Sequence, residues 1–375
     1  MVAGAIIVVA LAAVALAFSG AFGRGDGNSV GGNSAKVTAS APAVALIATL
    51  AGKAGVEGSA DGTGATARFA GAASITCDAS DNLYVADTGN NTIRKITPDG
   101  MVTTLAGQVG VEGGADGTGV AAAFSKPMGI TCDASGNLYV ADTGNNTIRK
   151  VTPNGVVTTV AGKAGANDNG AEDADGTGAT AAFGIPVGIT CDAHGDLYVS
   201  DLVNSLVRKI TSDGVVTTIA GHRPADGSGS ASSYEAPLGI TCDASGNVYA
   251  AKDDSTIREI TPTGVATTFA GKTGVQGSAD GTGSAARFNW PSGMTCDASG
   301  SIYLADGQNG TIRKITPEGV VTTIAVKSED KGGATNAGGP GAAALEDGPW
   351  GIACDSQGNL YITTSYTICK IAWSH

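Results

Sequence analysis

Aromatic side chains and histidines are scarce in this chain: aromatics make up 5% of 375 residues, and only three histidines occur. A rim of stacked aromatic rings that binds sugars is therefore not expected. The three histidines lie far apart in the sequence, which argues against a multi-histidine zinc site. Basic residues are also outnumbered, with 22 Lys and Arg against 34 Asp and Glu, for a net charge of −12. Because nucleic-acid binding depends on neutralising phosphates with Lys and Arg, we expect no nucleic-acid partner.

Unbroken apolar runs are missing too, apart from one at residues 2–18. This run predicts a signal peptide or a membrane anchor within residues 1–22. Small residues near its end favour cleavage, whereas the absence of Lys or Arg before it argues against cleavage. Residues 23–43 are rich in Gly, Ser and Ala and read as a flexible linker to a domain at 44–375. We expect that domain to be secreted, or membrane-anchored outside the cytoplasm.

What the chain does contain is one sequence motif repeated six times. Its fullest copy runs from Gly129 to Gly162, and copies lie between 51 and 59 residues apart. A period of this length indicates a repeat architecture. Each copy carries a cysteine at the same place, at Cys77, Cys132, Cys191, Cys242, Cys296 and Cys354. We expect these thiols to be small buried groups between repeats, too far apart for disulfides.

Within each copy, four short runs rich in β-branched residues alternate with turns rich in Gly, Asn, Asp and Pro. Four antiparallel strands per unit are typical of a propeller blade. An orphan fourth strand at residues 45–52 precedes the first copy, and the last copy stops after its third strand. The sequence therefore predicts an all-β, six-bladed β-propeller whose N-terminal strand closes the last blade and removes the open sheet edges.

The run Leu-Tyr-Val-Ala-Asp-Thr-Gly-Asn-Asn-Thr-Ile-Arg-Lys-Ile at residues 83–96, nearly repeated from Leu138, resembles the NHL repeat. The resemblance extends from about residue 44 to the C-terminus, in all six copies. It implies a propeller of the NHL type, but it says almost nothing about function, because propellers of this family serve unrelated roles.

An aspartate ends the second strand of most copies, and an arginine follows seven residues later in the third strand. Copy six has lost both, with Thr364 and Cys369 in their places. This joint loss predicts an ion pair inside each blade, with bidentate geometry. In copy four Lys252 replaces the aspartate, and Asp253 or Asp254 is the candidate partner of Arg258. The predicted structural pairs are Asp87–Arg94, Asp142–Arg149, Asp201–Arg208 and Asp306–Arg313.

An insert with the motif Asp-Gly-Thr-Gly precedes four of the copies and is followed by a phenylalanine. Two interpretations compete for its aspartate. One is a cap on a short helical turn that the aromatic anchors against the blade. The other is a ring of carboxylates on one rim that holds calcium or a cationic partner. We favour the cap. The aspartates concerned are Asp61, Asp116, Asp175 and Asp280.

Copy six has a different insert, a Gly- and Ala-rich segment at residues 327–350. Because it departs from the repeat, it is the best candidate for a specific contact with a partner, through Trp350, Lys327, Lys331 and Asp347. The second-to-third-strand loops, which share the insert rim, also contain glycosylation sequons at Asn90, Asn145 and Asn309.

These observations favour a non-catalytic binding scaffold that presents the loops of its insert-bearing rim to a protein or other macromolecular ligand. The alternative is a propeller lyase or hydrolase with a calcium ion at the channel mouth. No cofactor other than calcium is expected in either case.

Overall fold

A computed structural model describes residues 45–163, 174–221, 237–327, 343–345 and 348–373. The chain separates into two units, Met1–Pro42 and Ala43–His375, and all described residues belong to the second. Within the described ranges no helix is both long and apolar enough to cross a membrane. The apolar run at residues 2–18, the linker, Lys331 and Asp347 lie outside the described residues.

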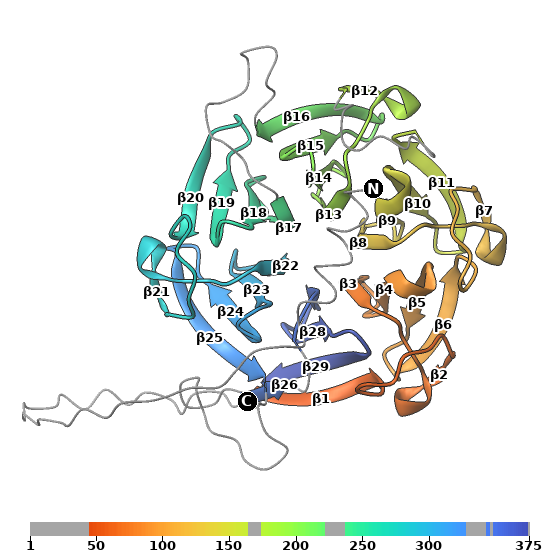
Figure 1. Ribbon diagram of the computed structural model, residues 1–375, viewed down its shortest axis with the longest axis horizontal. Helices are drawn as coiled ribbons and strands as arrows, with labels where there is room; N and C mark the ends of the chain where they lie inside the picture. The colour runs from red at the N-terminus through yellow and green to blue at the C-terminus, as the bar shows by residue number, and fades with distance from the viewer. Residues whose placement is uncertain (1–44, 164–173, 222–236, 328–342, 346–347, 374–375) are drawn as a thin grey trace, which may run out of the picture. The chain divides into compact units, whose positions relative to one another are not determined.

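The second unit is a ring of six antiparallel sheets, as the repeat predicts (Figure 1). The first strand of each blade lies nearest the centre of the ring and the fourth lies outermost. Blade one contains β3 (Ala72–Cys77), β4 (Leu83–Asp87), β5 (Thr92–Ile96) and β6 (Met101–Ala106). Blade two contains β8 (Pro127–Cys132), β9 (Leu138–Asp142), β10 (Thr147–Val151) and β11 (Val156–Ala161). Blade three contains β13 (Pro186–Cys191), β14 (Leu197–Asp201), β15 (Leu206–Ile210) and β16 (Val215–Gly221).

The remaining blades follow the same order, and the last is completed by the N-terminal strand. Blade four contains β17 (Pro237–Cys242), β18 (Val248–Lys252), β19 (Thr256–Ile260) and β20 (Ala266–Gly271). Blade five contains β22 (Pro291–Cys296), β23 (Ile302–Asp306), β24 (Thr311–Ile315) and β25 (Val320–Lys327). Blade six contains β27 (Ile352–Cys354), β28 (Leu360–Thr363), β29 (Thr367–Trp373) and β1 (Ala45–Gly52). The pairing of β1 with β29, from Ala45↔Trp373 to Gly52↔Thr367, confirms the predicted closure.

Blades one, two, three and five carry more strands than the four expected, because the insert folds back onto the outer edge of its own blade. Its Gly-Thr dipeptide pairs with the fourth strand, and a single 3₁₀ turn follows. Among the described residues these strands are β2 (Gly62–Thr63), β7 (Gly117–Thr118), β12 (Gly176–Thr177) and β21 (Gly281–Thr282). The turns are η1 (Gly64–Thr66), η3 (Gly119–Ala121), η5 (Gly178–Thr180) and η6 (Gly283–Ala285). In addition, β26 (Ala343–Leu345) pairs in parallel with β25.

Local sequence explains the two loops that recur between strands. After the first strand of blade two, the Asp133 carboxylate accepts hydrogen bonds from the backbone N–H groups of Ser135 and Asn137, at 2.9 and 2.8 Å. Gly136 supplies the left-handed conformation of this turn, with φ at 78°. After the second strand, a 3₁₀ turn forms in blades one and two, η2 (Thr88–Asn90) and η4 (Thr143–Asn145).

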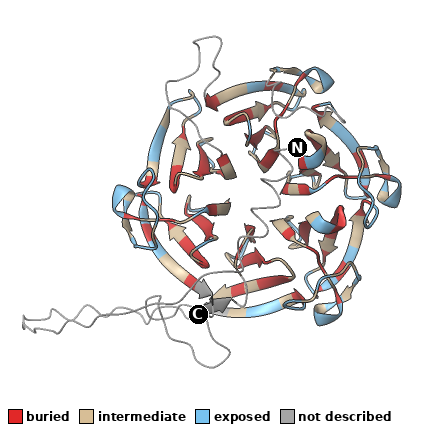
Figure 2. Cartoon of the chain, in the orientation of Figure 1, coloured by how far each residue is buried: buried red, intermediate tan, exposed pale blue. Residues whose placement is uncertain are grey.

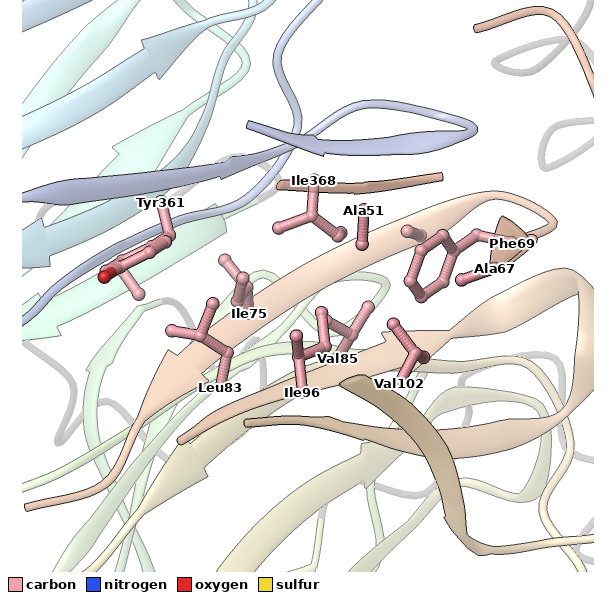
Figure 3. Close-up of a cluster of buried hydrophobic side chains, with 12 residues drawn as sticks. Ala51, Ala67, Phe69, Ile75, Leu83, Val85, Ile96, Val102, Tyr361 and Ile368 are labelled. Atoms are coloured by element: carbon pink, nitrogen blue, oxygen red, sulfur yellow. The ribbon is translucent and has the colours of Figure 1, made fainter. Parts of the chain in front are cut away.

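The hydrophobic core lies between neighbouring blades. Figure 2 shows buried residues concentrated in the inner strands and exposed residues along the outer edge and the inserts. In the cluster of Figure 3, Phe69, Ile75 and Leu83 of blade one pack with Tyr361 and Ile368 of blade six. Cys77 lies half-buried against this cluster. The other five repeat cysteines are half-buried in the same way, each beside a hydrophobic cluster, and so are less buried than expected.

A glycine in most of the first strands holds the inner strands close together. A Cβ atom at Gly129 would lie 2.3 Å from the Val187 carbonyl oxygen of the next blade. The same atom at Gly239 would lie 1.7 Å from the oxygen of Ser292. Real Cβ atoms do not approach carbonyl oxygens so closely, so the glycines allow the ring to close around a narrow centre.

Candidate functional site

The inserts and the loops between the second and third strands meet on one side of the propeller, which we call the insert rim. Asn90, in the loop of blade one, donates its side-chain amide to the carbonyl oxygen of Gly58 in the insert, at 2.8 Å. Asn145 and Asn309 make the same bond to Gly113 and Gly277. These three asparagines are the sequon residues, and each amide nitrogen also bonds to the aspartate that ends its second strand. The amides are thus already hydrogen-bonded within the fold.

An arginine bridges two carboxylates under this rim. In blade one, Arg94 Nη1 lies 2.7 Å from Asp87 Oδ2, and Nη2 lies 2.7 Å from Asp61 Oδ1. The guanidinium also donates to the carbonyl oxygens of Arg68 and Ala60, and it lies 5.2 Å from the centre of the Phe69 ring. The same arrangement recurs around Arg149, Arg208 and Arg313.

These contacts show the four predicted ion pairs, but with a different geometry. The pairing is not bidentate, because each guanidinium is shared between a buried aspartate and the aspartate of the insert. Nor does the insert aspartate cap its turn: the N-cap residue of η1 is Thr63. Asp61 instead accepts hydrogen bonds from the backbone and hydroxyl of Thr104, at 3.1 and 3.0 Å, besides its bond to Arg94. The cap interpretation was wrong because these partners are distant in sequence.

The calcium hypothesis concerns the same four insert aspartates. Asp61, Asp116, Asp175 and Asp280 belong to four different blades, and each is held by the arginine of its own blade. Among the described residues, no three His, Cys, Asp or Glu side chains form a group suited to a metal ion. A calcium ion at any of these carboxylates would have to compete with a guanidinium.

With both aspartates ionised, a network carries a net charge of −1, since one arginine lies between two aspartates. Burial raises the pKa of Asp142 to about 6, against the hydrogen bonds from Asn145 and Ser125 and the charge of Arg149. Burial raises the pKa of Asp87, Asp201 and Asp306 as well. Asp116, the insert aspartate in the network of Asp142, is half-exposed, with 50% of its side chain accessible. The insert rim thus presents four accessible carboxylates around the ring, at Asp61, Asp116, Asp175 and Asp280.

Blades four and six depart from this network. In blade six a neutral set replaces it: Thr364 and Thr367 share a hydrogen bond of 2.8 Å between hydroxyls, and Thr367 contacts the Cys369 sulfur at 3.7 Å. In blade four, Lys252 pairs with Asp254 at 3.0 Å. Asp254 therefore does not serve as the expected partner of Arg258, which donates to Thr268 Oγ1 and the Ala266 carbonyl oxygen.

Two tryptophans lie on the insert rim, one in blade six and one in blade five, which keeps the network. Trp350 precedes β27 and is half-buried. Trp290 precedes β22, is 38% exposed and adopts a left-handed backbone with φ at 57°. The sequence analysis missed Trp290, although the position before the first strand varies visibly between copies. Of the other predicted contact residues, Lys327 ends β25, where its backbone pairs with Leu345, while Lys331 and Asp347 lie outside the described residues.

The opposite rim carries a second regular feature, built from the first-to-second-strand turns. In blade two, the Tyr139 hydroxyl donates to Asp133 Oδ2 at 3.2 Å, and the Lys150 ammonium lies 5.7 Å from the centre of the tyrosine ring. Burial and the nearby carboxylates raise the pKa of the adjacent Cys132 thiol to about 12. These thiols are therefore protonated at neutral pH and unsuited to nucleophilic chemistry.

A cleft of about 570 Å³ runs between blades three and four. It is lined by Tyr198, Lys209 and the outer strand of blade three on one side, and by Val248 and Pro262 of blade four on the other. Lys209 is already paired there with Asp196, at 2.7 Å. The insert that precedes blade four, residues 222–236, lies outside the described ranges.

No protein-family model matches the chain. Among curated proteins, the chain is 26% identical over 309 residues to Protein SUPPRESSOR OF QUENCHING 1, chloroplastic, of Arabidopsis thaliana, which covers 75% of this chain and 28% of that protein. It is 34% identical over 136 residues to NHL repeat-containing protein 2 of Homo sapiens, covering 34% of this chain and 18% of that protein. The chain thus spans less than a third of the length of these relatives.

Among solved structures, a protein of unknown function from Bacteroides thetaiotaomicron matches with a TM-score of 0.65 and 22% identity, over 88% of this chain and 76% of that one. An auxiliary nutrient binding protein of the same organism matches with a TM-score of 0.64 and 19% identity, over 89% and 77%. A streptogramin B lyase matches with a TM-score of 0.54 and 16% identity, over 88% and 98%. At these identities the likeness is one of fold.

Fold and site together define a repeat propeller in which four blades share the same arginine–aspartate network and blades four and six depart from it. The protein is a six-bladed β-propeller of the NHL type.

Proposed function

We propose that this propeller is a non-catalytic binding scaffold that presents its insert rim to a protein or other macromolecular partner. We further propose that it works outside the cytoplasm, secreted or held at a membrane by residues 1–22, because of the apolar run at residues 2–18. The observation that carries the binding role is the presence of two tryptophans on the insert rim, Trp350 in the irregular blade six and Trp290 in the neighbouring blade five.

The physical argument for a binding role rests on side chains that the repeat does not require for folding. In the four arginine networks each charged group has a partner, and the networks serve the fold. The left-handed backbone of Trp290 also belongs to the repeat, since Gly71, Lys126 and Ile185 adopt it at the equivalent places. The exposed indole ring is different: the repeat does not require it, because the equivalent residues are glycine, lysine and isoleucine. Tryptophan is also the side chain most enriched among residues that dominate binding energy at protein interfaces. The fold likeness to a nutrient binding protein agrees with a binding role.

The enzyme alternative draws support from fold likeness alone, to a streptogramin B lyase and to a gluconolactonase of Xanthomonas campestris. Its calcium ion would need carboxylates that arginines already hold. Addition of calcium to the chelator-treated protein tests it: one ion bound per chain, with a raised melting temperature, would favour the enzyme over the scaffold.

Affinity capture from an extract of the source organism tests the scaffold directly. The bait is the full chain, compared with Trp350→Ser, which imports the residue of blade five, and with Lys314→Gln on the opposite rim as a control. We expect at least one protein to be retained by the wild type and by Lys314→Gln but lost with Trp350→Ser. If no protein shows this dependence, the insert rim is not the binding surface.

A further inference from the structure

The contact between blades five and six lacks the threonine hydroxyl that hydrogen-bonds blade one to blade two, and blade two to blade three, on the insert rim. In blade one, the Thr88 hydroxyl donates to the carbonyl oxygen of Pro127 in the next blade, at 2.6 Å. In blade two, Thr143 donates to Pro186 in the same way, at 2.7 Å. Blade five has Gly307 at this place. The corresponding acceptor, the Pro349 carbonyl oxygen, lies 3.6 Å from the point where a Cβ would stand and receives no threonine hydroxyl.

Both rim tryptophans are attached to this contact by their backbones. The Trp290 carbonyl oxygen accepts a hydrogen bond from the Gly307 N–H, at 3.2 Å. The Trp350 carbonyl oxygen accepts from the Gly293 N–H at 2.8 Å and from the Ser292 hydroxyl at 3.1 Å. The accessible backbone of Gly307, an acceptor oxygen and two indole-bearing residues thus meet at one place. We call this place the blade five–six contact.

The charge around the contact favours a cation. The rim holds four accessible carboxylates, and Asp280 of blade five is one of them, at 49% exposure. The whole chain carries −12. Cations are attracted to the faces of tryptophan rings, and arginine most often fills this role in proteins. A guanidinium also supplies N–H donors for an unfilled carbonyl acceptor.

Resting on the proposed function, we propose that the blade five–six contact binds a basic side chain of a protein partner, with arginine the best fit. Its guanidinium packs against Trp290 and Trp350 and donates to the Pro349 carbonyl oxygen. The acidic rim steers the basic segment toward the contact.

Hexa-arginine serves as the probe, with a hexapeptide of Gly and Ser and the neutral sugar cellohexaose for comparison, in titration calorimetry on the full chain. Two variants use residues that the protein already carries at equivalent places. Gly307→Thr adds the threonine of blades one and two; Gly307 itself does not have a left-handed backbone, so threonine fits there. Trp290→Gly adopts the residue of blade one, where Gly71 has φ at 65°. Ile185→Gly makes the same change in blade three and is the matched control.

We expect hexa-arginine to bind, and each of Trp290→Gly and Gly307→Thr to weaken it about tenfold, while Ile185→Gly stays within about twofold of the wild type. Equal affinity of all four proteins would show a purely ionic attraction and overturn the proposal. Absence of hexa-arginine binding would overturn it too, as would tryptophan-dependent binding of cellohexaose instead. The capture experiment separates the two hypotheses: a rim-dependent partner without arginine binding leaves the scaffold standing and removes only this inference.

Discussion

Removal of the arginine from one network should cost far more stability than removal of its exposed aspartate. Arg149 and Asp142 are both fully buried, whereas half of Asp116 is accessible. Arg149→Met leaves the buried Asp142 carboxylate without its countercharge, which costs about 3–5 kcal/mol. Asp116→Asn removes a half-exposed charge and keeps a polar group for Arg149, so its cost is about 0–1 kcal/mol.

The assay is thermal and urea unfolding followed by circular dichroism. At about 2–4 °C per kcal/mol for a domain of this size class, Arg149→Met should lower the melting temperature by roughly 6–20 °C and Asp116→Asn by a few degrees at most. The double variant Asp142→Thr/Arg149→Cys imports the neutral residues of blade six, Thr364 and Cys369, and should recover part of the loss. If Arg149→Met and Asp116→Asn are equally stable, or if the double variant is the least stable, the reasoning about the buried charge is refuted.

Three further predictions concern other features of the propeller. Gly239→Ala places a Cβ 1.7 Å from the Ser292 carbonyl oxygen and should destabilise the fold by about 3 kcal/mol or more, measured by urea unfolding. Gly195→Ala is the control: its Cβ would have no atom within 4 Å, but its backbone is left-handed, so the change should cost about 1 kcal/mol. Burial raises the pKa of Cys132 from 9.0 to about 12, so its thiolate fraction is about 1000-fold below normal; thiol titration at pH 8 should be slow in the native protein and fast in urea. Burial acts to raise the pKa of Asp133, but hydrogen bonds from Asn137, Ser135 and Tyr139 outweigh burial and lower the pKa. The stabilisation that Asp133 contributes is therefore present above about pH 4 and is lost as the pH falls. The difference in unfolding free energy between Asp133→Asn and wild type should shrink toward zero at about pH 2.

The sequence by itself determined the architecture, because its information on that point is local and repeated. Each strand and turn of a blade is encoded within one copy, and six copies plus the orphan strand at residues 45–52 leave only one way to close a ring. The pairing of β1 with β29 follows from that count. The buried ion pairs were also visible, because blade six lost both partners together and kept Thr364 and Cys369.

Only the tertiary structure decided how the inserts and the rim are arranged. Asp61 bonds to Arg94 and Thr104, which lie 33 and 43 residues away, so no local pattern separated this role from a helix cap. The meeting of Gly307 with Pro349 likewise arises where two blades touch. A repeat specifies what each blade contains, but contacts between blades depend on which side chains the ring brings together, and that is settled only when the ring closes.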